Sequence, residues 1–281
     1  MADHVFSSPS EQNQSSRTVL RVEDVDFFYH RRIPILRGLN IGFGSGMVAL
    51  IGPNGAGKST LLHLLSGWLK PCKGEVFLEG TPMRKHTRGE IARTLGVVPQ
   101  REEQLFPFSV TEVVELGLFA HGGFLGRSVT EEQRQRIQEL LVELGIQHLG
   151  DTPITECSGG ERQLALVARA LVGCPRILLL DEPTTWLDPL HQRVVLEMVR
   201  EWQQGAPERL VIMVTHDLSL ALSVAERVVL LNCGEVAYDG TPNDLLQNGL
   251  LEEVYRTTFE LSALPGGQVA IHPRWRGDGE N

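Results

Sequence analysis

Runs of apolar and polar residues divide the first third of the chain into strands and a helix. The stretch TVLRVEDVDFFYH (18–30) alternates apolar and polar positions, as a half-buried strand does, and RRIP then predicts a turn. MVALIG (47–52) and GEVFLEG (74–80) predict two further strands. Between them, STLLHLLSGWLK (59–70) has helical spacing and is expected to end at Pro71.

The remaining chain changes its pattern twice. Between about residues 101 and 172, segments such as TEEQRQRIQELLVELGI repeat apolar residues at helical spacing, which predicts a helical insertion. Strand-like runs then return at 176–181, 210–216 and 227–240, with helical stretches at about 190–203 and 217–226. Because strands alternate with helices, the pattern predicts a mostly parallel α/β sheet.

Both ends of the chain differ from this pattern. Residues 1–16 are polar and Ser-rich and lack the apolar core of a signal peptide, so we expect a flexible tail. The segment LLEEVYRTTF (250–259) shows helical periodicity. The Gly- and Pro-rich end, LPGGQVAIHPRWRGDGEN, is expected to be loosely attached.

Composition narrows the classes of function. With 42% hydrophobic and 22% charged residues, the 281-residue chain has the composition of a globular protein. A formal net charge of −9 argues against a nucleic-acid partner held by broad positive charge. The four cysteines lie far apart, so neither disulfides nor a zinc site is indicated. The longest apolar runs fall short of the roughly 20 residues that span a bilayer.

A glycine-rich loop follows the apolar strand at 47–52. GPNGAGKST fits the pattern G-x-x-x-x-G-K-[ST] and lies between a strand and a helix, as that motif requires. Its glycines let backbone N–H groups surround a phosphate, Lys58 supplies positive charge, and Ser59 suits Mg²⁺ ligation. We therefore predict a nucleotide site formed by Gly52, Pro53, Asn54, Gly55, Ala56, Gly57, Lys58, Ser59 and Thr60.

Two adjacent acids end the apolar strand ILLLD. The strand would deliver Asp181 toward the metal, and Glu182 then falls where an attacking water could be polarised. A bound Mg²⁺ would offset the repulsion between the two carboxylates. The alternative is that the two acids merely start a surface loop.

A second polar, Gly-rich segment, SGGERQ, starts another predicted helix. Ser158 is a plausible N-cap, and the exposed N–H groups of Gly159, Gly160 and Glu161 would form a second phosphate site. One γ-phosphate does not need two such sites on one chain, so we expect this one to serve a nucleotide bound by another copy. The alternative is an ordinary helix cap.

Taken together, GPNGAGKST, SGGERQ, ILLLDEP and the Thr-His pair at 215–216 resemble the nucleotide-binding subunit of an ATP-binding cassette (ABC) transporter, over roughly residues 18–245. The resemblance implies a P-loop NTPase (RecA-like) α/β core with an antiparallel β subdomain and an α-helical subdomain at about 101–172. The cassette would cover residues 17–245. Residues 246–281 would form a C-terminal extension without an assigned role.

The resemblance also implies roles for single residues. Tyr29 would stack on adenine, Gln100 would link Mg²⁺ to the membrane partner, and Asp188 would cross a dimer interface. Glu182 would be the catalytic base and His216 would contact the γ-phosphate.

Each of these roles has a simpler alternative. Tyr29 could be a core aromatic, with Phe28 beside it competing for the stacking role. Gln100 and His216 could be surface polar residues at strand ends. Cys157 stands where the family's signature motif has Leu, and a small apolar replacement should preserve the packing.

The partners follow from the same resemblance. Two copies would form a head-to-tail homodimer that encloses two ATP molecules with Mg²⁺. Without a fused membrane segment, the subunit would act peripherally at the cytoplasmic face of the inner membrane on separate integral membrane permease subunits, and indirectly on a substrate-binding protein. Leu105, Phe106, Phe108 and Val110 could line the docking groove, or could instead form the core of the helical insertion.

The cargo is suggested by one segment. DEPTTWLDPLHQ is similar to cassettes that serve iron–siderophore importers, whereas RQLALVARAL resembles molybdate and other metal-chelate systems. Cobalamin, haem and molybdate import stay open, as does a non-transport ABC ATPase acting on a soluble scaffold in cofactor assembly or repair. Trp186 would pack within the loop before Asp188 or stack on the dimer partner.

Overall fold

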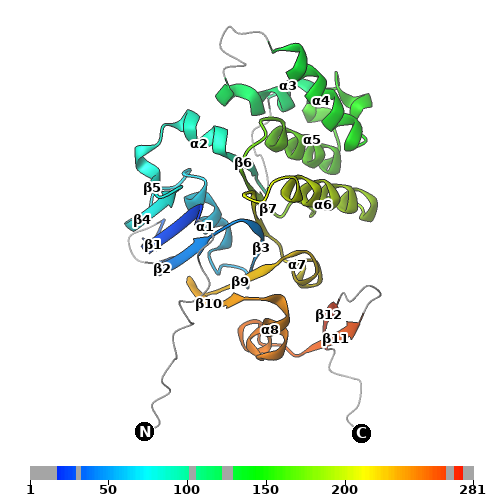
Figure 1. Ribbon diagram of the computed structural model, residues 1–281. Helices are drawn as coiled ribbons and strands as arrows, with labels where there is room; N and C mark the ends of the chain where they lie inside the picture. The colour runs from blue at the N-terminus through cyan, green and yellow to red at the C-terminus, as the bar shows by residue number, and fades with distance from the viewer. Residues whose placement is uncertain (1–17, 30–32, 101–105, 122–128, 264–268, 275–281) are drawn as a thin grey trace, which may run out of the picture.

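The computed structural model describes residues 18–29, 33–100, 106–121, 129–263 and 269–274. Figure 1 shows a small sheet in blue and cyan, a larger sheet at the centre, a helical part in green and a C-terminal part in orange and red. The tail expected at residues 1–16 lies outside the described residues.

The smaller sheet is antiparallel and has the strand order β2-β1-β4-β5. Its strands alternate buried and exposed residues, so that one face packs on the core while the other meets solvent. The bounds are Leu20–Phe27 for β1, Leu36–Phe43 for β2, Lys73–Leu78 for β4 and Thr81–Pro82 for β5.

The larger sheet has the strand order β10-β9-β3-β8-β7-β6. Strands β9, β3, β8, β7 and β6 run parallel, and β10 closes one edge as an antiparallel hairpin with β9. The bounds are Gly46–Ile51 for β3, Leu95–Val98 for β6, Ile177–Asp181 for β7, Leu210–Val214 for β8, Arg227–Asn232 for β9 and Glu235–Gly240 for β10.

Helices cover both faces of the larger sheet. They are α1 (Lys58–Leu65), α2 (Arg88–Thr94), α3 (Val110–Glu115), α4 (Glu131–Glu143), α5 (Gly159–Val172), α6 (Pro189–Gln204), α7 (Leu218–Val224), α8 (Pro242–Gln247) and α9 (Leu250–Tyr255). Short 3-10 turns lie at Met83–Lys85, Leu116–His121, Gln147–Leu149 and Ile154–Glu156. Among the helices that the structure describes, none has the length and apolar character of a membrane-crossing segment.

Alternation along the buried strands separates two large apolar clusters. Leu179 and Ile212 pack with α1 and the antiparallel sheet, whereas Leu178 and Met213 pack with α3, α4, α5 and α6. Helices α1 and α5 therefore lie on opposite faces of the larger sheet. The parallel α/β sheet, the antiparallel subdomain and the helical part that contains α3, α4 and α5 agree with the expected P-loop NTPase architecture.

The first helix is shorter than its periodicity predicted. It ends at Leu65, and the N–H groups of Gly67 and Trp68 bond back to the carbonyls of Leu64 and His63 in a Schellman-type turn. Gly67 has φ +69°, which suits glycine at this position. The predicted end at Pro71 was therefore wrong, because a glycine stops the helix first.

The C-terminal end also differs from expectation. Strands β11 (Phe259–Ala263) and β12 (Val269–Pro273) form an antiparallel hairpin, at the lower right of Figure 1. Ile271 is buried, and its N–H and carbonyl both bond to the Ser219 hydroxyl on α7, at 2.9 and 3.2 Å. Residues 269–271 are thus packed rather than loosely attached, because the consecutive apolar residues Val269, Ala270 and Ile271 are partly or fully buried, whereas His272 and Pro273 are exposed.

Candidate functional site

At two positions, the glycine-rich loop has a backbone conformation that only glycine tolerates. Gly52 has φ +145°, and a Cβ there would lie 2.2 Å from the Leu231 carbonyl oxygen. Gly57 has φ +102°, and a Cβ there would meet Leu36 at 2.6 Å. The loop therefore turns tightly between β3 and α1, which leaves its N–H groups near the start of α1, where a helix favours an anion.

Lys58 lies under this loop. Its ammonium group donates to the carbonyls of Gly52, at 2.7 Å, and Pro53, at 3.0 Å. Burial lowers the pKa of Lys58, while the negative charges of Glu182 and Asp181 act in the opposite direction. The cation, the loop and the two acids are thus within electrostatic reach of one another, as the sequence predicted.

Asp181 provides the test for a magnesium site. Its side chain is 2% exposed, and among the described residues its Oδ1 atom is buried with no hydrogen-bond partner. Burial raises the pKa of Asp181, whereas a hydrogen bond from Ser59 opposes that rise. A buried carboxylate oxygen with a free lone pair, next to a serine hydroxyl, fits the oxygen ligands that Mg²⁺ takes.

Glu182 adopts a left-handed backbone conformation with φ +52°, which is uncommon for a residue other than glycine. Its N–H bonds to the Val214 carbonyl at 3.0 Å, so the neighbouring strand holds this conformation. Its carboxylate accepts from the Thr185 hydroxyl at 2.9 Å and lies 2.7 Å from Nε2 of His216. Such strain, held in place by neighbours, is typical of functional sites.

Adjacent parallel strands bring these residues to one edge of the sheet. Gly52 follows β3, His216 follows β8, Asp181 ends β7, and Gln100 follows β6. The carboxyl ends of parallel strands are where open α/β sheets bind ligands. The alternative that Asp181 and Glu182 merely start a surface loop is therefore excluded, since both side chains are buried.

Tyr29 extends the site toward the antiparallel sheet. Its ring packs edge-on against the buried Phe27 at 5.0 Å, and its hydroxyl lies 3.5 Å from the Thr60 hydroxyl. Because Tyr29 is 57% exposed, it is not a core aromatic. An exposed ring beside the loop is available to stack on a flat ligand.

Ser158 caps α5 in a reciprocal pattern. Its hydroxyl accepts from the Glu161 N–H at 3.3 Å, and the Glu161 carboxylate accepts from the Ser158 N–H at 2.7 Å. The side chain of Ser158, and then its backbone N–H, lower the pKa of the Glu161 carboxyl group by hydrogen bonding to it. Cys157 is buried in the apolar cluster beside α5, so it packs as the small apolar residue that was expected.

The loop before α6 packs against the start of α5. Asp188 caps α6 by accepting from the His191 N–H at 2.9 Å, and its second oxygen lies 2.9 Å from Nδ1 of His191. A side chain added at Gly159 would meet the Cβ of Trp186 at 3.8 Å. Trp186 is nevertheless 51% exposed.

Four apolar residues could line a docking groove or form the core of the helical part, and the three that the structure describes do not form one surface. Leu105 lies outside the described residues. Phe106 and Phe108 are exposed and their rings lie 6.0 Å apart, whereas Val110 is fully buried among the helices. Val110 therefore belongs to the core of the helical part, because it is the first residue of α3 and faces inward.

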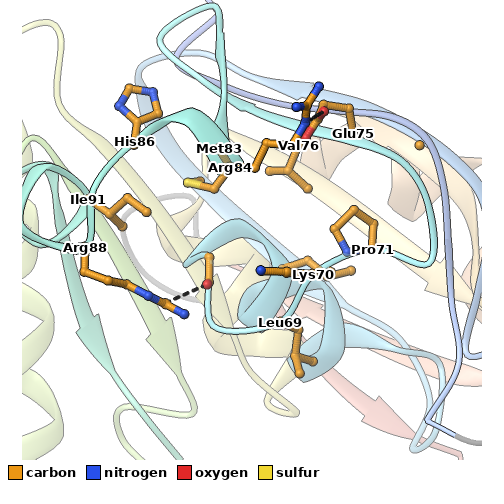
Figure 2. Close-up of a pocket in the computed structure, with 13 residues that line it drawn as sticks. Leu69, Lys70, Pro71, Glu75, Val76, Met83, Arg84, His86, Arg88 and Ile91 are labelled. Carbon is orange, nitrogen blue, oxygen red and sulfur yellow. Dashed lines mark hydrogen bonds and ion pairs between the residues drawn. The ribbon is translucent and has the colours of Figure 1, made fainter.

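A hollow of about 360 Å³ lies between the end of α1, β4 and α2 (Figure 2). Arg84 pairs with Glu75 at its rim, and Arg88 donates to the Gly67 carbonyl at 2.8 Å. None of the residues lining it belongs to the nucleotide loop or to the acidic pair. This hollow is therefore separate from the strand edge described above.

Sequence reasoning missed two residues that contact the site. Thr185 donates to Glu182, and its position three residues later in the same turn was the available signal. Tyr255 accepts a hydrogen bond from the Gly52 N–H at 3.0 Å. No local signal could identify Tyr255, since 203 residues separate it from Gly52.

The fold and this strand edge define a nucleotide-hydrolysing protein of the P-loop class. A family model described as ABC transporter matches residues 36–185, which is more than half of the chain. The chain belongs to the ABC transporter family, as its ATP-binding, ATP-hydrolysing component.

Curated relatives are similar along most of their length. The hemin import ATP-binding protein HmuV of Streptomyces coelicolor is 37% identical over an aligned region that covers 83% of this chain and 81% of HmuV. The iron(3+)-hydroxamate import ATP-binding protein FhuC of Bacillus subtilis is 34% identical, and the aligned region covers 88% of this chain and 91% of FhuC.

Solved structures agree with the fold. A putative metal-chelate type ABC transporter in an inward-facing conformation has a TM-score of 0.75 at 27% identity, covering 92% of this chain and 98% of that one. A dimeric ATP-binding cassette, MJ0796, bound to ADP and Pi, has a TM-score of 0.71 at 27% identity. The match covers 79% of this chain and 98% of the MJ0796 chain.

Proposed function

We propose that this chain hydrolyses ATP to energise import of an iron–siderophore or a related metal chelate, including haem, through separate membrane permease subunits. The observation that carries the proposal is the similarity, over more than four fifths of both chains, to import subunits for hemin and for iron(3+)-hydroxamate. A substrate-binding protein would deliver the cargo to the permease. The chain would then act peripherally at the cytoplasmic face of the membrane.

In the proposed mechanism, the glycine-rich loop and Lys58 bind the phosphates of ATP, and Tyr29 stacks on the adenine. Ser59, Asp181 and Gln100 would hold Mg²⁺, which neutralises phosphate charge when bound. Glu182 would accept the proton of the attacking water, and His216, 2.7 Å away, would keep the carboxylate oriented and contact the γ-phosphate.

Two copies are needed to complete the site in this proposal. The phosphate loop leads into α1, and α1 and α5 lie on opposite faces of the sheet, so we expect the start of α5 to serve a nucleotide other than the one bound by the loop of the same chain. The N–H groups of Gly159 and Gly160 would therefore contact ATP held by a second copy, whereas the N–H of Glu161 bonds to the Ser158 hydroxyl, with Asp188 and the exposed Trp186 at the shared interface.

Substitution of Ser158 distinguishes a phosphate site from a plain helix cap. Ser158→Ala should cost about 1 kcal/mol of unfolding free energy and should also weaken ATP-driven dimerisation. Ser109→Ala is the matched control, because Ser109 and Glu112 form the same reciprocal cap on α3. Both variants are compared by urea unfolding and by size-exclusion chromatography with ATP. Equal dimerisation of the two would leave Ser158 as a cap only.

The identity of the transported cargo is tested by measuring uptake in the native host. Replacing the chromosomal copy with one that encodes Glu182→Gln should abolish uptake of ⁵⁵Fe-labelled hydroxamate chelate or of hemin, while cobalamin and molybdate uptake persists. Glu197→Gln, on the exposed face of α6, should leave uptake unchanged. If iron-chelate uptake persisted and the tagged chain co-purified with soluble proteins rather than with a multi-span protein, the non-transport alternative would be favoured.

A further inference from the structure

The C-terminal extension packs directly behind the nucleotide loop. A third apolar cluster combines Ala49 and Ile51 of β3 with Leu245 of α8, Leu251 of α9 and Ile271 of β12. All five side chains are buried. The strand that leads into the nucleotide loop is therefore supported on this side by residues that lie some 200 positions later in the chain.

One hydrogen bond extends this support to the loop itself. Tyr255 is the last residue of α9, and its hydroxyl accepts from the N–H of Gly52 at 3.0 Å. The ring packs edge-on against Phe259 at 6.0 Å. Burial raises the pKa of Tyr255 to about 12, so the hydroxyl is a neutral acceptor throughout the physiological range.

Both polar groups of the Gly52 backbone form hydrogen bonds. Its N–H donates to Tyr255, and its carbonyl accepts from the Lys58 ammonium at 2.7 Å. Its φ of +145° and its close approach to the Leu231 carbonyl leave it little room to move. A movement of the Gly52 N–H would therefore also move the Gly52 carbonyl, which orients Lys58. Lys58 is the cation expected to contact the phosphates.

We propose that Tyr255 is a positioning residue for ATP binding, which fixes the first residue of the nucleotide loop through the Gly52 N–H and gives the C-terminal extension a role in the ATP site. The inference concerns ATP binding by the family's cassette and is independent of the cargo. It assigns a role to α9, for which the sequence suggested none.

Tyr255→Phe tests the proposal, because it removes the hydroxyl and keeps the ring in place. Without the hydroxyl, the loop is held less firmly before ATP binds, so that binding must also order it at a cost of up to about one hydrogen bond, and the Kd for ATP should rise roughly three- to tenfold. The KM of the ATPase should rise in parallel, whereas kcat should change less than twofold. Kd is measured by calorimetry on the purified full chain, and the KM by phosphate release.

Tyr238→Phe is the matched control. Tyr238 packs against the same apolar cluster, and its hydroxyl donates to the Thr241 carbonyl at 2.8 Å, outside the nucleotide loop. Both variants lose one phenol hydrogen bond, so their melting temperatures should fall similarly, yet only Tyr255→Phe should weaken ATP binding. Amide hydrogen exchange should then quicken at residues 47–58 in Tyr255→Phe alone.

An unchanged Kd in Tyr255→Phe, or an equal loss of ATP affinity in both variants, would overturn the proposal, since either result would assign Tyr255 to the packing of the extension only. A lower kcat at constant KM would overturn it as well. Because the assay uses ATP and the purified chain, failure here leaves the import proposal untouched, and failure of the uptake experiment leaves this inference untouched.

Discussion

Glu182→Gln should lower the rate of ATP hydrolysis by about 10²- to 10⁴-fold while ATP binding is retained, because an amide cannot accept the proton of the attacking water. The amide has the shape of the carboxylate and can still bond to Thr185 and His216, which lie 2.9 and 2.7 Å away. The unusual backbone of Glu182 should therefore persist. Phosphate release measures turnover, and calorimetry measures ATP binding.

The same variant should accumulate as a dimer in ATP, since hydrolysis would normally separate the two copies. Light scattering detects this change in mass. Glu197→Gln is the control, because Glu197 is an exposed glutamate that pairs with Arg193 on α6. A Glu182→Gln protein that hydrolyses ATP at near the wild-type rate would eliminate Glu182 as the base.

Lys58→Ala should weaken ATP binding itself, with the Kd rising roughly 10- to 100-fold, because the phosphates lose a charge-assisted hydrogen bond. The substitution also removes a positive charge that interacts with Asp181 and Glu182, so their negative charges would face the phosphates with less compensation. Calorimetry with ATP measures the loss. The contrast with Glu182→Gln is diagnostic, since one variant loses binding and the other loses turnover.

Lys73→Ala is the control for Lys58→Ala. Lys73 is an exposed lysine on β4 that pairs with Asp24 at 2.8 Å, away from the nucleotide loop. Its removal should leave the Kd for ATP unchanged. Equal affinity of the Lys58→Ala and wild-type proteins would show that the loop binds phosphate through its backbone N–H groups alone.

Several elements were not predictable from the periodicity of the chain. The pattern did not predict β2, α2 or β6. Strand β6 has only four residues, which is too short for a periodic signal, and it is recognisable only by its parallel pairing with β7. Strand β2 contains Gly38 and Gly42, which interrupt the alternation that marks a strand.

The nucleotide loop, the acidic pair, the capped helix at Ser158 and the sheet type could be predicted from sequence by itself. Each depends on residues close together in the chain, where phosphate binding, helix capping or strand burial constrains consecutive positions. The meeting of Glu182 with His216, the placement of α1 and α5 on opposite faces of the sheet, and the contact of Tyr255 with Gly52 were decided only by tertiary structure. These depend on strand order and on packing between distant segments, and no local pattern of residues encodes either.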